Sequence, residues 1–336
     1  MVFTLIDDVL SRGRVMFRIL VRRLFTSVPT VLFCTMLVFA FRYLLPGGPV
    51  QAMLGGVSGG GQVTPAQLAE LKRRLGLNSS IVVQYWDWLV NALHGNLGTS
   101  YFTQVPVTTA IGQRVAPSLE LIIGALLVSF IVGGSLGIFS AIKRQRPVGR
   151  IILSGTGLGL SIPDFWLATI AAGVLGLTLH LFPAVGFTPL SEGVAANLHT
   201  VILPILVLSV VTSSFIARHL RSAMVSVLES PYIRTAWASG LPSWKVYMNC
   251  ALRNALGPTI TFLPLAFTAL VGGTVLVENV FNIPGLGTEI VSSVSYQDYP
   301  VVQGIVLLIG VLVAVLNLLA DLTLAMLDPR IRRNVA

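Results

Sequence analysis

Long apolar segments recur along the whole sequence and are separated by shorter polar stretches. Six of these segments have about 20 residues or more, which is the length that a helix needs to cross the hydrocarbon core of a bilayer. The pattern therefore predicts an all-α, polytopic membrane protein. The six predicted transmembrane helices cover approximately residues 26–45, 118–142, 155–181, 198–217, 258–281 and 301–327.

Composition and charge agree with this interpretation. A chain with 54% hydrophobic and 10% charged residues is not an ordinary soluble domain. Its net charge of +9 would suggest nucleic-acid binding in a soluble protein, but the basic residues cluster beside the apolar segments. Seventeen of the 22 Lys and Arg residues fall in segments 1–25, 143–150, 218–257 and 328–336. Because basic loops stay on the cytoplasmic side, we expect both termini in the cytoplasm.

The largest predicted extracytoplasmic region, residues 46–117, joins the first two transmembrane helices. Two helices are predicted within it, at about 64–75 and 79–93. We expect a small folded domain, because structureless connections longer than about 15 residues are uncommon. Its location makes it a candidate contact for an external partner. The exposed aromatic candidates are Tyr85, Trp86 and Trp88.

The longest polar interruption among the last five apolar segments is residues 229–258. Ser230 and Pro231 are typical of an N-cap and a first helical residue, and Gly240 is typical of the residue that ends a helix. Pro242 then starts a second helix after a two-residue turn. Two interpretations fit this pattern: a short rigid helix presented to a cytoplasmic partner, or an amphipathic helix lying on the lipid headgroups.

The sequence lacks the motifs of a nucleotide-hydrolysing enzyme. None of its lysines follows Gly and precedes Ser or Thr, so no P-loop is present. We therefore expect that the chain is not an enzyme and that a separate subunit carries any ATP-driven step. Its four histidines are scattered, and it has neither a His-Glu-x-x-His motif nor paired cysteines, so we expect no metal site. The three lysines are Lys72, Lys143 and Lys245.

Residues 133–137 match the Gly-x-Ser-x-Gly pattern of serine hydrolases. That motif needs a strand-to-helix elbow to expose its serine, whereas Ser135 lies inside an apolar helical segment. Small residues in such a segment allow helices to approach closely. We therefore interpret Gly133 and Gly137 as helix-packing residues, with an intramembrane hydrolase as the alternative.

Asp164 lies near the middle of the third predicted transmembrane helix. Ionisable groups at such depth are costly and are functional candidates. Beside a proline-interrupted turn, Pro163, Asp164 and Phe165 could line a pathway, where the carboxylate of Asp164 could meet an ammonium group of a solute. Alternatively, freed backbone donors or a neighbouring helix satisfy the carboxylate. Glu120 and Glu278 lie near predicted outer helix ends, where solvation is cheap, and we assign them no role.

The sequence YIRTA-x-A-x-GL followed by ALRNA resembles the cytoplasmic coupling loop of ABC importer permeases, in the dipeptide/oligopeptide and nickel branch. The general signature, E-A-A-x3-G, is occupied here by Arg234, Thr235, Ala236 and Gly240. Trp237 and Ser239 depart from the branch, which usually has a basic residue and Lys there. The motifs PGGPV, LGLN, HGNLGTS, F-x-x-PGLG, DYP-x-VQG and LDPRIRR resemble the same branch, so the resemblance covers nearly the whole chain.

The resemblance implies a type I ABC importer permease fold in the bacterial inner membrane, with a core at 118–327 that carries the coupling loop 218–257. It implies four kinds of partner: a second homologous permease, two ATPase subunits that bind ATP and Mg²⁺, an external substrate-binding protein, and the bilayer. The implied cargo is a di- or oligopeptide, and the alternative cargoes are nickel or another small polar solute. The alternative class of protein is a secondary transporter. The implied coupling residues are Tyr232, Ile233, Arg234, Thr235, Ala236, Trp237, Gly240 and Leu241.

Overall fold

The computed structural model describes residue 21 and residues 25–40 and 79–327, and this part of the chain is helical with connecting loops. Thr99 and Pro106 form an isolated antiparallel β-bridge. The predicted helix at 64–75, the end of the first predicted transmembrane helix and the C-terminal tail lie outside the described residues. The helix predicted at 79–93 is present as α4 (Ile81–Leu93).

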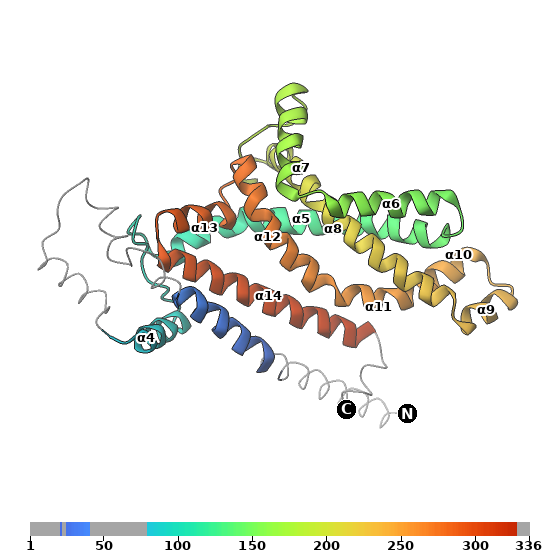
Figure 1. The fold of residues 1–336 in the computed structure, drawn as a ribbon, viewed down its shortest axis with the longest axis horizontal. Coiled ribbons are helices and arrows are strands. Elements are labelled where there is room, and N and C mark those ends of the chain that lie inside the picture. The colour runs from blue at the N-terminus through green and yellow to red at the C-terminus, as the bar shows by residue number, and fades with distance from the viewer. Residues whose placement is uncertain (1–20, 22–24, 41–78, 328–336) are drawn as a thin grey trace, which may run out of the picture. The chain divides into compact units, whose positions relative to one another are not determined.

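Four of the described helices are long and apolar enough to cross a membrane. A shorter apolar helix, Phe25–Ala40, covers the described part of the first predicted transmembrane segment. The other four agree in position with the second, fourth, fifth and sixth predicted segments (Figure 1). They are α5 (Val107–Ile142), α8 (Val194–Leu228), α12 (Leu263–Phe281) and α14 (Tyr299–Leu327).

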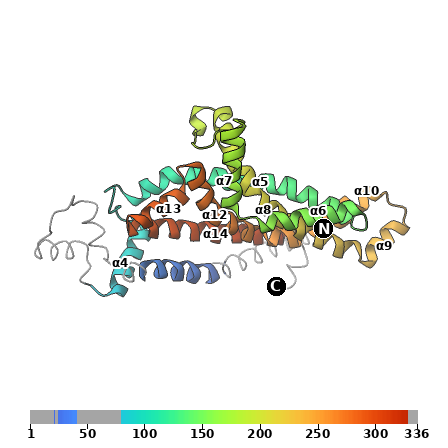
Figure 2. The ribbon, with the colours of Figure 1, turned by 45° about the horizontal axis from the view of Figure 1, so that its top comes forward.

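The third predicted segment, 155–181, is not one straight helix. It comprises α6 (Pro147–Ser161), α7 (Asp164–Ala171) and the π-helix η1 (Ala172–Thr178), and the two parts are bent by 94°. The cause is local, because Pro163 lacks an amide hydrogen and forces Ile162 into an extended conformation, with ψ of 122°. Both views show α7 projecting away from α6 (Figures 1 and 2).

The described residues divide into two compact units. Of the described residues, the first unit comprises residues 21, 25, 119–283 and 313–327, and the second comprises residues 26–40, 79–118 and 284–312. The division falls inside α5 and α14, so each of these helices contributes residues to both units.

Glycines bring α5 and α8 of the first unit into close contact. Gly124 of α5 faces the side chain of Ile205, Gly133 faces the backbone of Ser213, and Gly137 faces the backbone of Ala217. The residue numbers rise together along both helices, so α5 and α8 run parallel. This agrees with the predicted topology, in which both helices cross in the same direction. The turn after α5 and the chain after α8 therefore lie at the same end.

The second unit is built around the start of α5, α13 (Leu286–Ser295) and the start of α14. Its core includes Val107, Ile111 and Ile305, all at most 5% exposed. Gly304 allows this close approach, since a Cβ there would lie 2.7 Å from side-chain atoms of both Val107 and Ile111.

Two of the three aromatic side chains that we expected to be exposed on α4 pack against the helix Phe25–Ala40 instead. Tyr85 donates a hydrogen bond from its hydroxyl to the Leu32 carbonyl (3.0 Å), and its ring packs edge-on against Phe39 at 5.5 Å. Trp88 stacks on Tyr85 at 6.0 Å. Burying these rings removes apolar surface from water, so only Trp86, 63% exposed, remains a surface candidate.

Candidate functional site

The polar stretch that the sequence singled out folds as a short helix, α9 (Pro231–Ala238). Ser230 is its N-cap, with φ −70° and ψ 149°, and Pro231 is its first residue, as predicted. The Ser230 hydroxyl does not cap the helix. It donates instead to the Val227 carbonyl at 2.5 Å and ties the start of α9 to the end of α8.

The C-terminal end of α9 is closed by two hydrogen bonds across Gly240. The Gly240 amide donates to the Trp237 carbonyl at 3.0 Å, and the Leu241 amide donates to the Ala236 carbonyl at 3.3 Å. This pair of bonds is the Schellman motif, which needs a left-handed residue just after the helix. Gly240 supplies it with φ +75°, so the predicted helix stop is confirmed.

Ile233 fixes α9 to the rest of the first unit. Its side chain is completely buried in a cluster with Leu220 and Met224 of α8 and with Ala141 of α5. Full burial of such a side chain contributes about 1.5–3 kcal/mol. Ile233 and the partly buried Ala236 therefore hold the helix in place, and the other residues of α9 provide its exposed face.

The chain that follows braces α9 from the other side. It consists of α10 (Ser243–Lys245), the π-helix η3 (Val246–Leu252) and α11 (Arg253–Thr261). The Asn254 side chain donates to the Tyr232 hydroxyl at 3.0 Å. The rings of Trp237 and Tyr247 meet edge to face at 5.7 Å. These contacts join both ends of α9 to η3 and α11.

The surface of α9 that remains exposed carries polar and aromatic groups. Arg234 and Thr235 are exposed, Tyr232 is 46% exposed and Trp237 is 40% exposed. Leu241, just beyond the helix, is 38% exposed. A helix capped at its C-terminal end, anchored underneath and exposed on its outer face can transmit a push as a rigid body. Of the implied coupling residues, all except Ile233 and Ala236 are available for contact with a partner.

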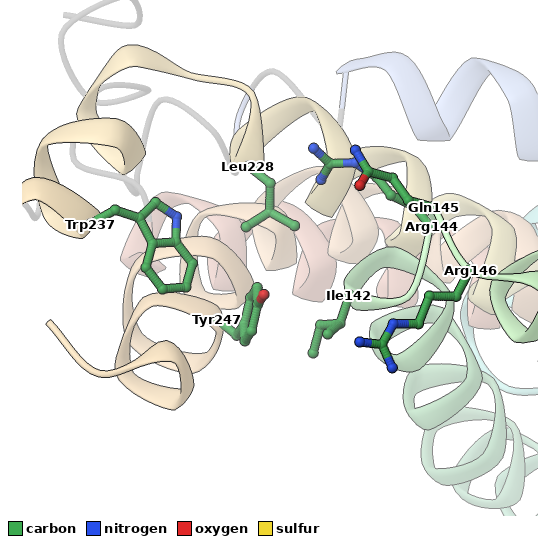
Figure 3. A pocket seen from close by; sticks show the side chains of 7 residues that line it. All are labelled: Ile142, Arg144, Gln145, Arg146, Leu228, Trp237 and Tyr247. Atoms are coloured by element: carbon green, nitrogen blue, oxygen red, sulfur yellow. The ribbon is translucent and has the colours of Figure 1, made fainter.

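A pocket of about 250 Å³ lies beside α9 in the first unit. It is bounded by the end of α5, the turn that follows, the end of α8, α9 and η3. Trp237 and Tyr247 stand on one side, the polar side chains of the turn stand on the other, and two apolar side chains lie between them (Figure 3). Its lining residues are Ile142, Arg144, Gln145, Arg146, Leu228, Trp237 and Tyr247.

At the break between α6 and α7, one oxygen of Asp164 has no hydrogen-bond partner in the part of the chain that the structure describes. Pro163 caps α7, and its carbonyl accepts the amides of Trp166 and Leu167, both at 3.1 Å. Oδ1 of Asp164 is buried and accepts no hydrogen bond from the described residues. Oδ2 points toward Gly273 of α12, where a Cβ would lie 2.7 Å from it. Phe165, the third candidate of this group, is 49% exposed.

The Gly-x-Ser-x-Gly match is a helix-packing feature, as we interpreted it. Gly133 and Gly137 are buried where α5 meets the backbone of α8. Ser135 lies on the exposed side of the same uninterrupted helix. The strand-to-helix elbow that a hydrolase requires is therefore not formed at this serine.

Two carboxylates have positions that sequence reasoning missed. Glu278 of α12 is completely buried, although we expected a solvated helix end. Asp298, 4% exposed, accepts hydrogen bonds from the Ser100 hydroxyl and from the amides of Tyr101 (3.0 Å) and Phe102 (3.4 Å). The only signal for Asp298 was its place before Tyr-Pro at a helix start, and its partners lie almost 200 residues away.

Comparison with known proteins gives concordant family matches. Residues 133–333 match the family described as binding-protein-dependent transport system inner membrane component, and residues 16–122 match its N-terminal counterpart. The probable peptide ABC transporter permease protein of Sinorhizobium fredii is 34% identical over 313 residues, covering 93% of this chain and 98% of that protein. The glutathione transport system permease protein of Salmonella choleraesuis is 36% identical over 317 residues, with 94% and 99% coverage.

A solved structure shares the fold. The match is to a chain of the MetNI methionine ABC transporter in an inward-facing conformation. The TM-score is 0.51 at 19% sequence identity, and the match covers 68% of this chain and 97% of that chain. At this identity the likeness concerns the fold alone, and it agrees with the predicted all-α permease architecture.

Proposed function

This chain belongs to the family of binding-protein-dependent transport system inner membrane components, and on that premise we propose that it is a permease subunit of an ABC importer for di- and oligopeptides. It is a multi-pass protein of the inner membrane and works in a complex with ATPase and other subunits. Its family role is that of a membrane permease and not of an enzyme.

The observation that carries the proposal is the geometry of α9. This helix bears the residues that resemble the importer coupling signature, and it is short, closed by Gly240 and anchored by Ile233. Movement of an ATPase subunit against its exposed face would be passed to α8 and α5 through the buried cluster. The ATPase subunits bind ATP and Mg²⁺. Closure of the two ATPase subunits tilts α9 and switches the pathway between inward- and outward-facing states.

The proposed assembly follows from this role. A second, homologous permease completes the pathway, two ATPase subunits bind the two coupling helices in the cytoplasm, and an external binding protein delivers the cargo. The basic turn 143–146 and α9 lie at the same end of the parallel helices α5 and α8, which supports a cytoplasmic location for both. Both termini are then cytoplasmic, and α4 faces outward.

Peptides are the favoured cargo. The two relatives described above are named for peptide and glutathione transport, and glutathione is itself a tripeptide. Peptides are therefore preferred to nickel or another small polar solute. The unpartnered oxygen of Asp164 at a break within a membrane segment supports a position on the pathway, where it would accept a hydrogen bond from a peptide ammonium group.

Purification tests the assembly directly. The tagged chain, expressed with the other subunits of its transporter, is expected to co-purify with an ATPase subunit and to show ATP hydrolysis stimulated by loaded binding protein. The same chain purified with no other subunit is expected to hydrolyse no ATP. Hydrolysis by the isolated chain, or transport without any ATPase subunit, would contradict the proposal.

A further inference from the structure

The pocket beside α9 combines positive charge with an aromatic wall. Arg144 and Arg146 come from the turn after α5, whereas Trp237 comes from α9 itself (Figure 3). Arg146 of the turn and Trp237 of the helix are 91 positions apart in sequence but line the same cavity of about 250 Å³. The proposed coupling surface is therefore not confined to α9 and continues onto the 143–146 turn.

The positive charge of this pocket is poorly compensated by the described chain. Among the described residues, Arg144 has one ion-pair partner, Glu229, at the long distance of 3.9 Å, and the Glu229 side chain is 64% exposed. Arg146 is exposed and makes no ion pair with the described residues. Guanidinium groups bind carboxylates through paired hydrogen bonds, so a pocket with two of them fits a carboxylate.

We propose that this pocket is a carboxylate-binding site, in which an Asp or Glu side chain of the ATPase subunit is held between the 143–146 turn and Trp237. The inference rests on the proposed function, and it adds a second point of contact to the one that α9 provides. A carboxylate seated there would join α5 and α9 to the same part of the motor. The two helices would then move together when the motor closes.

The position of the pocket favours a protein carboxylate over a lipid phosphate. Arg218 is the first charged residue after the apolar part of α8, and Leu228 lies ten residues further on. That separation is about 15 Å along a helix axis, whereas the headgroup layer on each side of a bilayer is about 5–7 Å thick. The aromatic wall comes from α9 and η3, which follow α8 past its end. An ATPase bound to α9 would reach this wall directly.

The test measures the dissociation constant of the ATPase subunit for the assembled permease pair in nanodiscs. Discs of neutral phosphatidylcholine are compared with discs that contain anionic phosphatidylglycerol. In neutral discs, the double variant Arg144→Gln/Arg146→Gln is expected to bind the ATPase about tenfold more weakly, with a shallower dependence on salt. Arg150→Gln, which removes an exposed arginine of the same basic segment outside the pocket, is expected to leave the constant within about twofold.

A change of opposite sign sharpens the test. Glu229→Gln removes the acidic group that competes for Arg144, so binding is expected to tighten about two- to threefold. Thermal melting of each permease variant in detergent checks that the fold is unchanged, as expected for substitutions of partly or fully exposed side chains.

The outcomes separate this inference from the proposed function. If the wild-type pair fails to bind the ATPase, the proposed function is wrong. If the wild-type pair binds and the double variant binds equally well in neutral discs, the carboxylate site alone is wrong. An effect of the double variant that appears only in anionic discs would assign the pocket to a lipid phosphate and would also overturn the inference.

Discussion

The amide of Leu241 donates a hydrogen bond to the carbonyl oxygen of Ala236 at 3.3 Å, and this bond closes the C-terminal end of α9. The two residues can meet only because Gly240 between them has a positive φ of 75°. A residue with a Cβ adopts this left-handed backbone conformation at a cost of about 1–2 kcal/mol. The turn by which the chain leaves the C-terminal end of α9 therefore depends on a single glycine.

The contact between α5 and α8 predicts different outcomes for two adjacent glycines. In Gly133→Ala the new Cβ would collide with the backbone of Ser213, whereas in Gly134→Ala no atom of a neighbouring segment of the described chain lies within 4 Å of the new Cβ. Gly133→Ala is expected to lower the stability of the permease by about 1–3 kcal/mol, and Gly134→Ala is expected to leave it unchanged or slightly raised. Thermal unfolding of the two variants in the same detergent makes the comparison. Equal melting temperatures would show that α5 and α8 do not pack through Gly133.

The hydrogen bonds that Asp298 accepts are expected to protect two backbone amides from hydrogen exchange with water. Asp298→Ala removes the acceptor of the Tyr101 and Phe102 amides, so both amides are expected to exchange their hydrogens with water faster, and stability is expected to fall by about 2–3 kcal/mol. Asp87→Ala, at an exposed position on α4, is the matched control and is expected to change neither quantity. Unchanged exchange at residues 101 and 102 in Asp298→Ala would mean that the carboxylate does not hold this loop.

The unpartnered oxygen of Asp164 predicts a transport defect in a conservative variant. Asp164→Asn keeps the size of the side chain but removes its charge, so uptake of a peptide with a free ammonium group is expected to fall about tenfold. Uptake into proteoliposomes that contain the whole transporter is the measurement, and Glu192→Gln, at an exposed position, is the control. If Asp164 has only a packing role, Asp164→Asn and Glu192→Gln will both transport at the wild-type rate.

The proposed orientation predicts opposite labelling of two tryptophan positions. In a background with Cys34 and Cys250 replaced by serine, Trp86→Cys is expected to react with an impermeant thiol reagent added to intact cells. Trp244→Cys is expected to react only after the membrane is opened. Both native side chains are more than 60% exposed, so the difference reports the side of the membrane and not burial. Labelling of Trp244→Cys alone in intact cells would reverse the topology.

The features that the sequence predicted correctly are those set by local chemistry. Ser230, Pro231 and Gly240 mark the ends of α9 through backbone geometry that depends on a few neighbouring residues. Long apolar segments similarly gave the positions of α5, α8, α12 and α14, because length and apolarity alone decide whether a helix can cross a bilayer. The packing role of Gly133 followed from its apolar helical context.

The features that the sequence missed depend on contacts between distant segments. Hydropathy shows that 155–181 is apolar but not that Pro163 bends it by 94°, since many transmembrane helices tolerate proline. The aromatic pattern of α4 did not reveal that Tyr85 would meet Leu32 and Phe39, 53 and 46 positions away. The burial of Glu278 and the partners of Asp298 likewise depend on tertiary structure.

The central claim is that α9 transmits movement from the motor, and Gly240→Val tests it. Valine at a positive φ strains the Schellman motif by about 1–2 kcal/mol or more, which is enough to tilt α9 without unfolding the permease. Gly155→Val is the matched control, because Gly155 lacks a positive φ and has no atom near its Cβ position. Arg234→Glu, which reverses an exposed charge on α9, is expected to act in the same direction.

The decisive measurement is ATP hydrolysis by the reconstituted transporter, with and without loaded binding protein, alongside peptide uptake. Gly240→Val is expected to insert and express normally and to lose both substrate-stimulated hydrolysis and uptake, while Gly155→Val retains both. If Gly240→Val keeps wild-type stimulation and wild-type uptake, α9 is not the element that couples this permease to its motor.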